Sequence, residues 1–412
     1  MMGFVARIGS ILVLLTPFGA SACADRRPAA ALPERRDSSG IIIFEGIVPD
    51  SRGAEWRIAE EPELTIGVVE GDRRYEMEHV RDAAVLSDGR IAVVDWGANQ
   101  LRVYGHDGSY EFAVGGQGGG PGRLNRPTDL TVLPGDTLAV LDRTQGFSRS
   151  FFTSSGTFIR RQTVTPAFLD TLHFTGQATL LGDASVLFRV ASVSYMRTLP
   201  RGVSREPVGL VRLEERPGGT EVDTIAWFEG QEFYSTVVGD EPMGTATLLG
   251  PSAVWTSGGA HVYVADTGTG EVHGYDYSGG LKLVARYTLP REPVTPEQVK
   301  QGQETFLEQM PTQDGPRWRR YFDGSPRPSE HPAIQTLVAD PEGDLWLQAF
   351  PSSSTQLPSW WVIRSIDGSV VAVDFPRRLE VMEVGSDYVL GLWRDEQNVQ
   401  FVQKYRLEKS SS

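Results

Sequence analysis

An internal repeat of about 47 residues constrains the fold of this chain more than any other feature of its sequence. Residues 81–116 align with residues 128–163, and Asp95 of the first unit falls 47 positions before Asp142 of the second. Each unit contains four short runs of alternating apolar and polar residues, separated by turns rich in Gly and Asp. Such alternation indicates strands, and four strands in about 40 to 50 residues are typical of one blade of a β-propeller.

Less regular copies of the unit follow along the chain. One begins near residue 179, two more cover residues 252–287 and 334–375, and the last, at 379–407, contains only three strands. The run at 62–71 can supply the missing outer strand, so that both ends of the chain pair in one sheet and no sheet edge is left exposed. The sequence therefore predicts an all-β protein, a six-bladed β-propeller of four-stranded antiparallel blades closed by an N-terminal strand.

The segment VGGQGGGPGRL, residues 114–124, resembles a phosphate-binding loop only in its glycine content. A phosphate loop of the Walker or dinucleotide type must lead into a helix, whose N-terminus binds the phosphate. Here the glycines lead into Pro121 and Arg126-Pro127, and then into another strand. We interpret the segment as the link between blades 1 and 2, where glycine permits positive φ angles.

The first 22 residues have the layout of a secretory signal peptide, with a short basic start, an apolar run and a small-residue cleavage site. Cys23, the only cysteine of the chain, directly follows Ala20-Ser21-Ala22. This stretch resembles the lipobox of bacterial lipoproteins, in which the cysteine is lipidated; cleavage at an ordinary Ala-x-Ala site is the alternative. Residues 23–40 are polar and rich in Arg, Pro and Ala, which predicts a flexible tether, and residues 409–412 a short C-terminal tail.

Three segments, residues 93–108, 115–132 and 264–280, resemble NHL-repeat and related six-bladed β-propeller lipoproteins of bacteria. The likeness covers roughly residues 60–408. It implies a propeller within residues 41–408 and a bacterial cell-envelope protein attached to a membrane through lipid. It implies little about function, because the scaffold serves enzymes, binding proteins and adaptors alike.

The loop lengths predict which face of the propeller carries function. We label the strands of each blade a to d from the axis to the rim. Because neighbouring strands alternate in direction, the b-to-c and d-to-a connections emerge on one face and the a-to-b and c-to-d turns on the other. The turns of the second, tight-turn face are short, whereas the long connections all fall on the first, insertion-rich face, at 191–207, 229–250, 291–330 and 350–359. Long irregular segments on a rigid scaffold usually carry function, so we expect a binding site there.

The segment 291–330, between blades 4 and 5, contains the one helix that the sequence predicts. Thr295 can cap its N-terminus, with Pro296 in the first helical position and Gln298 completing a capping box, and Pro311 ends it.

Behind this helix, the stretch GPRWRRYF at 315–322 combines three arginines with three aromatic residues. It can form a lid that offers Arg317, Trp318 and Arg320 to an anionic or glycan-like ligand. Alternatively, its aromatic residues pin the insertion to the propeller while the arginines pair with acidic neighbours.

The inner strands and b-to-c turns of blades 1 and 2 supply further candidates at the axial mouth of the insertion-rich face. Two of them, Asp82 and Asp129, can ligate a divalent cation such as calcium or can form hydrogen bonds at the strand starts. No ring of carboxylates repeats in the later units. The candidate ligand-binding residues at the mouth are Arg81, Asp82, Trp96, Asn99, Thr128, Asp129 and Arg143.

Charge and motif content limit the function classes. A formal net charge of -14 disfavours nucleic acid as a partner. The six histidines form no metal-binding pair of the H-x-x-x-H type, and no G-x-S-x-G nucleophile motif is present. The sequence favours a monomeric binding module for a protein, peptide or carbohydrate of the cell envelope, without a cofactor. A hydrolase or lyase that uses a divalent cation at the axis is the alternative, and a structural scaffold is a third hypothesis.

Overall fold

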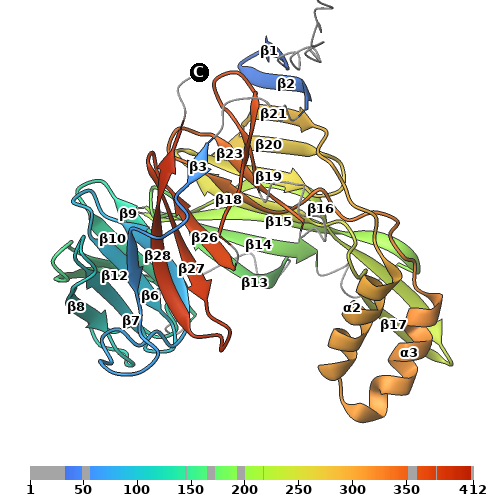
Figure 1. Ribbon diagram of the computed structural model, residues 1–412, viewed down its shortest axis with the longest axis horizontal. Coiled ribbons are helices and arrows are strands. Elements are labelled where there is room, and N and C mark those ends of the chain that lie inside the picture. Colours follow the sequence, from blue (N-terminus) through green and yellow to red (C-terminus); the bar gives the residue numbers. More distant parts are fainter. Residues whose placement is uncertain are drawn as a thin grey trace, which may run out of the picture.

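The strands form six sheets that follow one another along the chain (Figure 1), as the repeat predicts. The computed structural model describes residues 33–48, 56–143, 146–164, 172–192, 200–216, 218–350, 360–376 and 378–409. Cys23, the predicted signal peptide and most of the predicted tether lie outside these residues. No helix of the described residues is long and apolar enough to cross a membrane.

Blades 1 and 2 are regular four-stranded antiparallel sheets, each with its strands in sequence order from the axis outwards. Blade 1 contains β5 (Val80–Val85), β6 (Ile91–Asp95), β7 (Gln100–Tyr104) and β8 (Tyr110–Gly115). Blade 2 contains β9 (Asp129–Leu133), β10 (Thr137–Asp142), β11 (Phe147–Phe152) and β12 (Phe158–Val164).

The repeated aspartate at the end of strand b has a structural role. In blade 1 the buried Asp95 carboxylate accepts backbone N–H bonds from Glu78, His79 and Ala98, at 3.0–3.1 Å. It thereby fixes both the b-to-c turn and the segment that leads into the inner strand.

The glycine-rich segment is the link between β8 and β9, as predicted. Gly115, Gly116, Gly118 and Gly122 all have positive φ angles, and no helix follows them. A Cβ atom at Gly115 would come within 2.7 Å of the Asn99 carbonyl oxygen, so glycine is required there for space as well as for backbone conformation.

Blade 3 departs from the prediction because its outer strands are much longer than those of the other blades. It contains β13 (Leu172–Leu180), β14 (Val186–Ser192), β15 (Gly202–Arg216), β16 (Gly219–Val238) and β17 (Glu241–Ala246). The prediction of a long loop over 229–250 was wrong, since most of this segment is the hairpin of β16 and β17. The prediction of a loop over 191–207 was wrong at both ends, because β14 continues to Ser192 and β15 begins at Gly202. Residues 193–199 and nearly all of the loop predicted at 350–359 lie outside the described residues.

Blade 4 is extended by the N-terminal segment. Its own strands are β18 (Ala253–Gly258), β19 (His261–Asp266), β20 (Glu271–Asp276) and β21 (Leu281–Tyr287). A hairpin of β1 (Glu34–Ser38) and β2 (Ile41–Ile47) adds to its outer edge, with β2 parallel to β21. The tether prediction was therefore wrong over residues 34–38, where the chain is a strand anchored by the adjoining β2, whose Phe44 and Ile47 are fully buried.

Blades 5 and 6 complete the ring. Blade 5 contains β22 (Ile334–Ala339), β23 (Leu345–Ala349), β24 (Trp360–Ile363) and β25 (Val370–Val373). Blade 6 contains β26 (Leu379–Val384), β27 (Tyr388–Arg394) and β28 (Gln400–Glu408). Its outer positions are taken by β4 (Leu64–Ile66) and β3 (Arg57–Ile58), which pair antiparallel with β28. The predicted closure by an N-terminal strand is thus confirmed.

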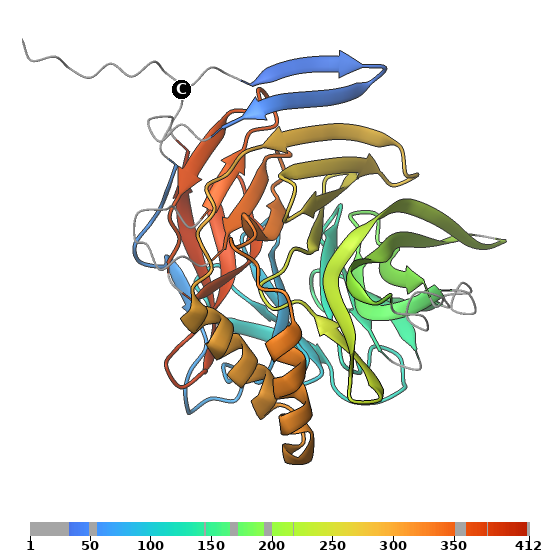
Figure 2. The ribbon, with the colours of Figure 1, turned by 90° about the vertical axis from the view of Figure 1, so that its right-hand side faces the viewer.

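Hydrophobic packing joins each blade to the next. Six clusters of buried apolar residues lie at the six boundaries between consecutive blades, including the boundary of blade 6 with blade 1. At this last boundary Ile66 packs with residues of β5, β6 and β27. Figure 2 shows the sheets arranged around a centre. Because apolar contacts continue around the whole circle, the sheets form a six-bladed propeller rather than an open array.

The insertion between blades 4 and 5 contains two α-helices, α2 (Pro296–Glu308) and α3 (Gly315–Gly324), joined through a 3₁₀ turn, η2 (Thr312–Asp314). The predicted capping box of Thr295 and Gln298 is present, and α2 ends before Pro311 as predicted. The sequence did not predict α3 as a helix. A seventh apolar cluster, built around Met243, Tyr321 and Phe322, fixes both helices to the β16–β17 hairpin.

Candidate functional site

The inner strands of all six blades line a central channel of about 680 Å³. This volume lies within the range of small-molecule sites. The inner edge of each inner strand has no further strand beside it, so backbone N–H groups at this edge need other partners. Side chains of neighbouring blades supply some of these partners.

Three carboxylates in the channel connect four consecutive blades through such bonds. Asp82 of blade 1 accepts the N–H of Leu130 in blade 2, at 2.8 Å. Asp129 of blade 2 accepts the N–H of Leu180, at 2.7 Å, and the hydroxyl of Thr179 in blade 3.

Glu383 of blade 6 accepts the N–H of Val85 in blade 1, at 2.8 Å, and the hydroxyl of Tyr388, at 2.6 Å. Sequence analysis did not identify Glu383 as a channel residue. The three carboxylates therefore hold blades 6, 1, 2 and 3 together at the axis.

Burial raises the pKa of all three carboxyl groups. The pKa of Asp129 is raised to about 7, even though Thr179, Leu180 and the nearby Arg81 favour its ionised form. The pKa of Asp82 lies well above its usual value, because of burial and then because of the negative charge of Asp129. Burial likewise raises the pKa of Glu383. The ionised forms are therefore costly in the folded protein at neutral pH.

Replacing Asp129 with Asn should stabilise the protein at alkaline pH. A raised folded-state pKa contributes stability below the unfolded pKa of about 4, and this contribution is lost as pH rises through about 7. Asn is neutral and can still accept the Leu180 N–H bond. We expect D129N to unfold with a free energy about 1 to 3 kcal/mol higher than wild type at pH 8 and close to wild type at pH 4. Urea denaturation at the two pH values measures this.

Asp107 provides the matched control, because hydrogen bonds from Ser109 lower the pKa of this exposed carboxyl. Asp107→Asn should therefore change the free energy of unfolding in the opposite direction, with a loss of stability at pH 8 that fades at low pH. If D129N were less stable than wild type at pH 8, the raised pKa of Asp129 would be contradicted.

The sequence predicts two possible roles for Asp82 and Asp129, cation binding and hydrogen bonding at the strand starts. Their contacts show the hydrogen bonding. Each of these carboxylates accepts at least two hydrogen bonds from inner-strand groups. The described residues contain no group of three or more His, Cys, Asp or Glu side chains that is placed to hold a metal ion.

Two guanidinium groups lie on aromatic rings on the insertion-rich face, and of these two arginines only Arg81 also lines the channel. Arg81, at the start of β5, is exposed and lies 5.5 Å from the ring centre of Trp96, in the b-to-c turn of the same blade. The His79 ring packs edge-to-face with the Trp96 ring, with ring centres 4.9 Å apart. In blade 2 the exposed Arg143 lies 5.5 Å from the ring centre of Phe147 and donates to the carbonyl oxygen of Gly176, at 3.0 Å. These groups offer flat apolar surface beside positive charge.

Two other predicted mouth residues are occupied by backbone contacts. Asn99 has a positive φ of 57° and accepts the N–H of Arg126, at 2.7 Å, so it joins the b-to-c turn of blade 1 to the link that enters blade 2. Thr128 donates its N–H to the carbonyl oxygen of Leu141, at 2.8 Å. Both residues shape the mouth rather than offering free groups to it.

The residues predicted on the lid belong to α3, and most of them pack against blade 3. Arg317 pairs with Glu241 and donates to the Met243 sulfur. Trp318 contacts Phe306 of α2, with ring centres 4.8 Å apart. The Tyr321 hydroxyl bonds to the backbone of the β16–β17 hairpin. In these contacts the aromatic residues and Arg317 attach the insertion to blade 3, which was the alternative to a ligand-binding lid. Arg320 remains exposed.

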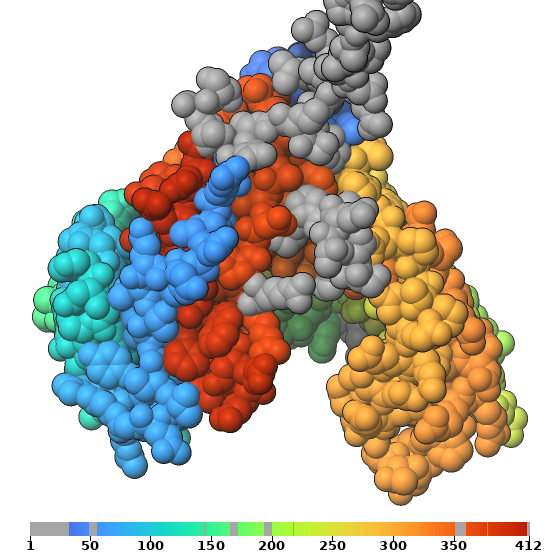
Figure 3. All heavy atoms as spheres, in the orientation of Figure 1, coloured from blue at the N-terminus to red at the C-terminus, as the bar shows by residue number. Residues whose placement is uncertain are grey.

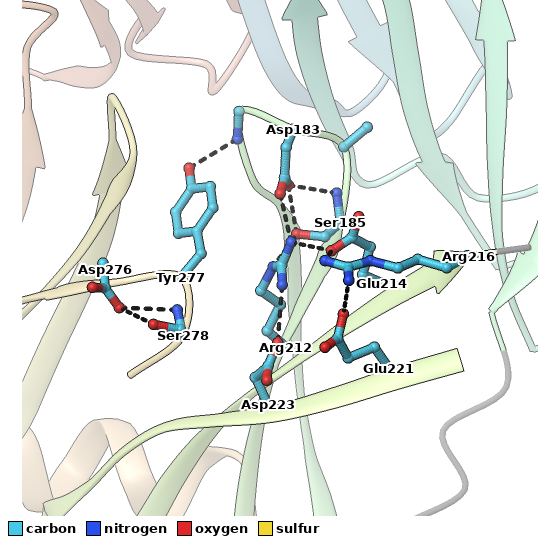
Figure 4. Close-up of polar contacts among 12 residues, drawn as sticks. Asp183, Ser185, Arg212, Glu214, Arg216, Glu221, Asp223, Asp276, Tyr277 and Ser278 are labelled. Carbon is cyan, nitrogen blue, oxygen red and sulfur yellow. Dashed lines mark hydrogen bonds and ion pairs between the residues drawn. The ribbon is translucent and has the colours of Figure 1, made fainter. Parts of the chain in front are cut away.

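A buried arginine in blade 3 is the most highly connected charged residue that the sequence interpretation missed. Arg212 is 6% exposed and contacts Asp183, Glu214 and Asp223, at 2.6, 2.6 and 2.9 Å (Figure 4). It also donates to the Ser185 hydroxyl, at 2.8 Å.

Tyr277 of blade 4 lies against this arginine. The guanidinium carbon of Arg212 is 5.6 Å from the centre of the Tyr277 ring. The Tyr277 hydroxyl accepts the Gly182 N–H of blade 3 and donates to the Gly259 carbonyl of blade 4. The Arg212 cluster, defined as Arg212 with these carboxylates and Ser185, therefore supports the boundary of blades 3 and 4.

No protein-family model and no curated protein sequence matches the chain. Among solved structures it is similar to a Bacteroides fragilis protein assigned as exported, at 11% identity and a TM-score of 0.45, over 89% of this chain and 99% of that one. It is also similar to Staphylococcus aureus virginiamycin B lyase, at 10% identity and a TM-score of 0.40, over 86% and 100%. A third similar structure is a PQQ-bound aldose sugar dehydrogenase of Streptomyces coelicolor, at 10% identity and a TM-score of 0.40, over 86% of this chain and 99% of that one. The propeller assignment depends on the sheets and clusters described above, and these distant likenesses assign no ligand or reaction.

Proposed function

We propose that this propeller is a binding protein that engages a protein, a peptide or a carbohydrate on its insertion-rich face. The observation that carries the proposal is the pairing of exposed arginines with aromatic rings on this face, Arg81 with Trp96 and Arg143 with Phe147. Exposed guanidinium and aromatic groups are over-represented where proteins bind partners, and they suit ligands with flat faces or negative charge.

The shape of this face supports the same proposal. The insertion projects from the ring, and a cleft separates it from blade 6, as the space-filling view shows (Figure 3). A rigid arm beside a ring of loops gives a concave surface, which can cover more of a ligand than a flat face does. The packing of α3 on the β16–β17 hairpin fixes the arm, so less ordering is needed when a ligand binds.

Peptide and glycan arrays test the proposal. We expect wild type to bind members of one array and an Arg81→Ala/Trp96→Ala variant to bind them at least tenfold more weakly, since a guanidinium and its aromatic partner each contribute about 1 kcal/mol or more. Arg74→Ala is the matched control, because the exposed Arg74 lies on the Tyr110 ring at 5.4 Å, near a c-to-d turn. Equal losses in both variants, or no bound member in either array, would contradict the proposal.

We also propose that the protein is exported in a bacterium and anchored to a membrane through lipid on Cys23, as in the NHL-type lipoproteins that the sequence resembles. The support is the segment up to Cys23, which combines an apolar run, a small-residue stretch and the only cysteine of the chain. Wild type should partition into the detergent phase of a Triton X-114 extraction, and Cys23→Ser protein should move to the aqueous phase. A Cys23→Ser protein that still enters the detergent phase would rule out this anchor.

A further inference from the structure

A second hollow lies between blades 2 and 3 on the tight-turn face, away from the site proposed above. Its volume is about 560 Å³, a size suited to a small molecule. Residues of β11 and β12 form one wall. The β13–β14 turn and the end of β15 form the facing wall.

Arg149, on the first wall, is a buried cation whose hydrogen-bonding capacity is not filled. The residue is 4% exposed. Its Nη1 donates to the carbonyl oxygen of Ala184, but its Nε is buried and has no hydrogen-bond partner. Among the described residues, no carboxylate forms an ion pair with Arg149. Burial lowers the pKa of Arg149, as expected for a charge removed from water without a close counter-ion.

The strand register places a second arginine and an aromatic ring beside Arg149. Arg149 pairs with Gln162 across β11 and β12, and Phe151 pairs with Arg160. All four side chains line the hollow, because residues two apart on a strand share a face. The exposed Arg160 guanidinium lies 4.4 Å from the Phe151 ring centre. The wall therefore presents two cations above an apolar surface.

The carboxylates of the facing wall are already paired with other groups. Asp183 and Glu214 each contact Arg212, at 2.6 Å (Figure 4). Glu215 accepts the hydroxyl of Thr220, at 2.9 Å. None of them forms an ion pair with Arg149 or Arg160, although at longer range all three favour the charged form of Arg149. Their negative charge repels a ligand that carries more than one negative charge.

We propose that this hollow binds a small ligand that carries a single carboxylate beside an apolar group. The carboxylate would pair with the guanidinium groups of Arg149 and Arg160, both of which belong to residues that line the hollow, and charged hydrogen bonds of this kind are strong. The apolar group would lie against Leu133, which also lines the hollow and is half-buried. A phosphate dianion fits less well because of the acidic facing wall.

Binding of phenylacetate to the full-length protein, followed by isothermal titration calorimetry at constant ionic strength, tests the proposal. We expect saturable binding in the millimolar range. Phenylacetamide, which has the same shape without the charge, and inorganic phosphate should each bind at least tenfold more weakly. Binding of the amide as tight as that of the acid, phosphate binding of equal strength, or no binding of phenylacetate would overturn the proposal.

Three variants locate the binding. Arg149→Met should weaken phenylacetate binding at least tenfold, and Arg160→Ala at least threefold. Arg286→Ala is the control, since Arg286 pairs with Glu45 and Glu271 in blade 4 and does not line the hollow, and it should change affinity less than twofold. If Arg149→Met does not fold, the exposed Arg160→Ala decides. Unchanged binding in folded Arg149→Met or in Arg160→Ala would overturn the assignment.

Discussion

Replacing Arg212 with Met should lower the free energy of unfolding by about 2 to 3 kcal/mol, less than the cost of breaking a fully buried ion pair, because the carboxylates left behind are 25–39% exposed. Arg212 is 6% exposed and lies among Asp183, Glu214 and Asp223. Methionine fills a similar volume but leaves these carboxylates and the Ser185 hydroxyl with one contact fewer. Chemical denaturation at pH 7, followed by tryptophan fluorescence, measures the change.

Arg216→Met is the matched control for this prediction. Arg216 also contacts Glu214, but its side chain is 55% exposed, and such surface pairs contribute about 1 kcal/mol or less. The Arg212→Met deficit should also shrink at acidic pH. Burial alone would raise the pKa of Asp183, but bonds from Ser185 and Arg212 lower it overall, so its stabilising contribution is lost as pH falls. Equal effects of the two variants would show that the Arg212 cluster is not the support inferred here.

A disulfide across the ring closure should stabilise the protein by about 2 to 4 kcal/mol, since it links positions 338 apart in the sequence. Thr65 of β4 pairs with Gln403 of β28, and the Gln403 amide nitrogen is 3.4 Å from the Thr65 hydroxyl. Two cysteines at these positions, in a Cys23→Ser background, should therefore oxidise to a single bond. The gain is the difference in urea midpoint between oxidised and reduced protein.

Val69 provides a control position for the cross-link. It follows β4 in the same segment, is 56% exposed and has no pairing with β28. A Val69→Cys/Gln403→Cys pair should stay reduced under conditions in which the Thr65→Cys/Gln403→Cys pair oxidises. If the Thr65→Cys/Gln403→Cys pair fails to oxidise in folded protein, the closure of the ring between blades 6 and 1 is wrong.

The fold could be predicted because its determinants repeat along the sequence. Strand alternation and turn residues recur about every 47 positions, and a final unit with one strand too few leaves only the run at 62–71 to complete it. The capping box at Thr295 and Gln298 is equally local, since both of its hydrogen bonds join residues three positions apart. Local and periodic signals of this kind need no knowledge of distant contacts.

Other features depend on contacts that the sequence does not reveal. Glu383 was missed because a bulge between Val381 and Glu383 shifts the alternation of β26, and a one-residue shift moves every following side chain to the other face. The sequence of β1 is charged and resembles a solvated tether. It forms a strand because its partner β2 pairs with β21, a contact that the local sequence does not reveal. The helix α3 begins at Gly-Pro and depends on packing against the β16–β17 hairpin, as do the roles of Arg317 and Trp318.

The pairing of β4 with β28 has a consequence for the order of events during biosynthesis. Because β4 must wait for β28, the nascent polypeptide carries an uncovered apolar boundary until β28 has been made. A product that stops before β28 would keep β27 and Ile66 uncovered, and would be open to aggregation or degradation. The ring can therefore close only in a polypeptide in which β28 has been made.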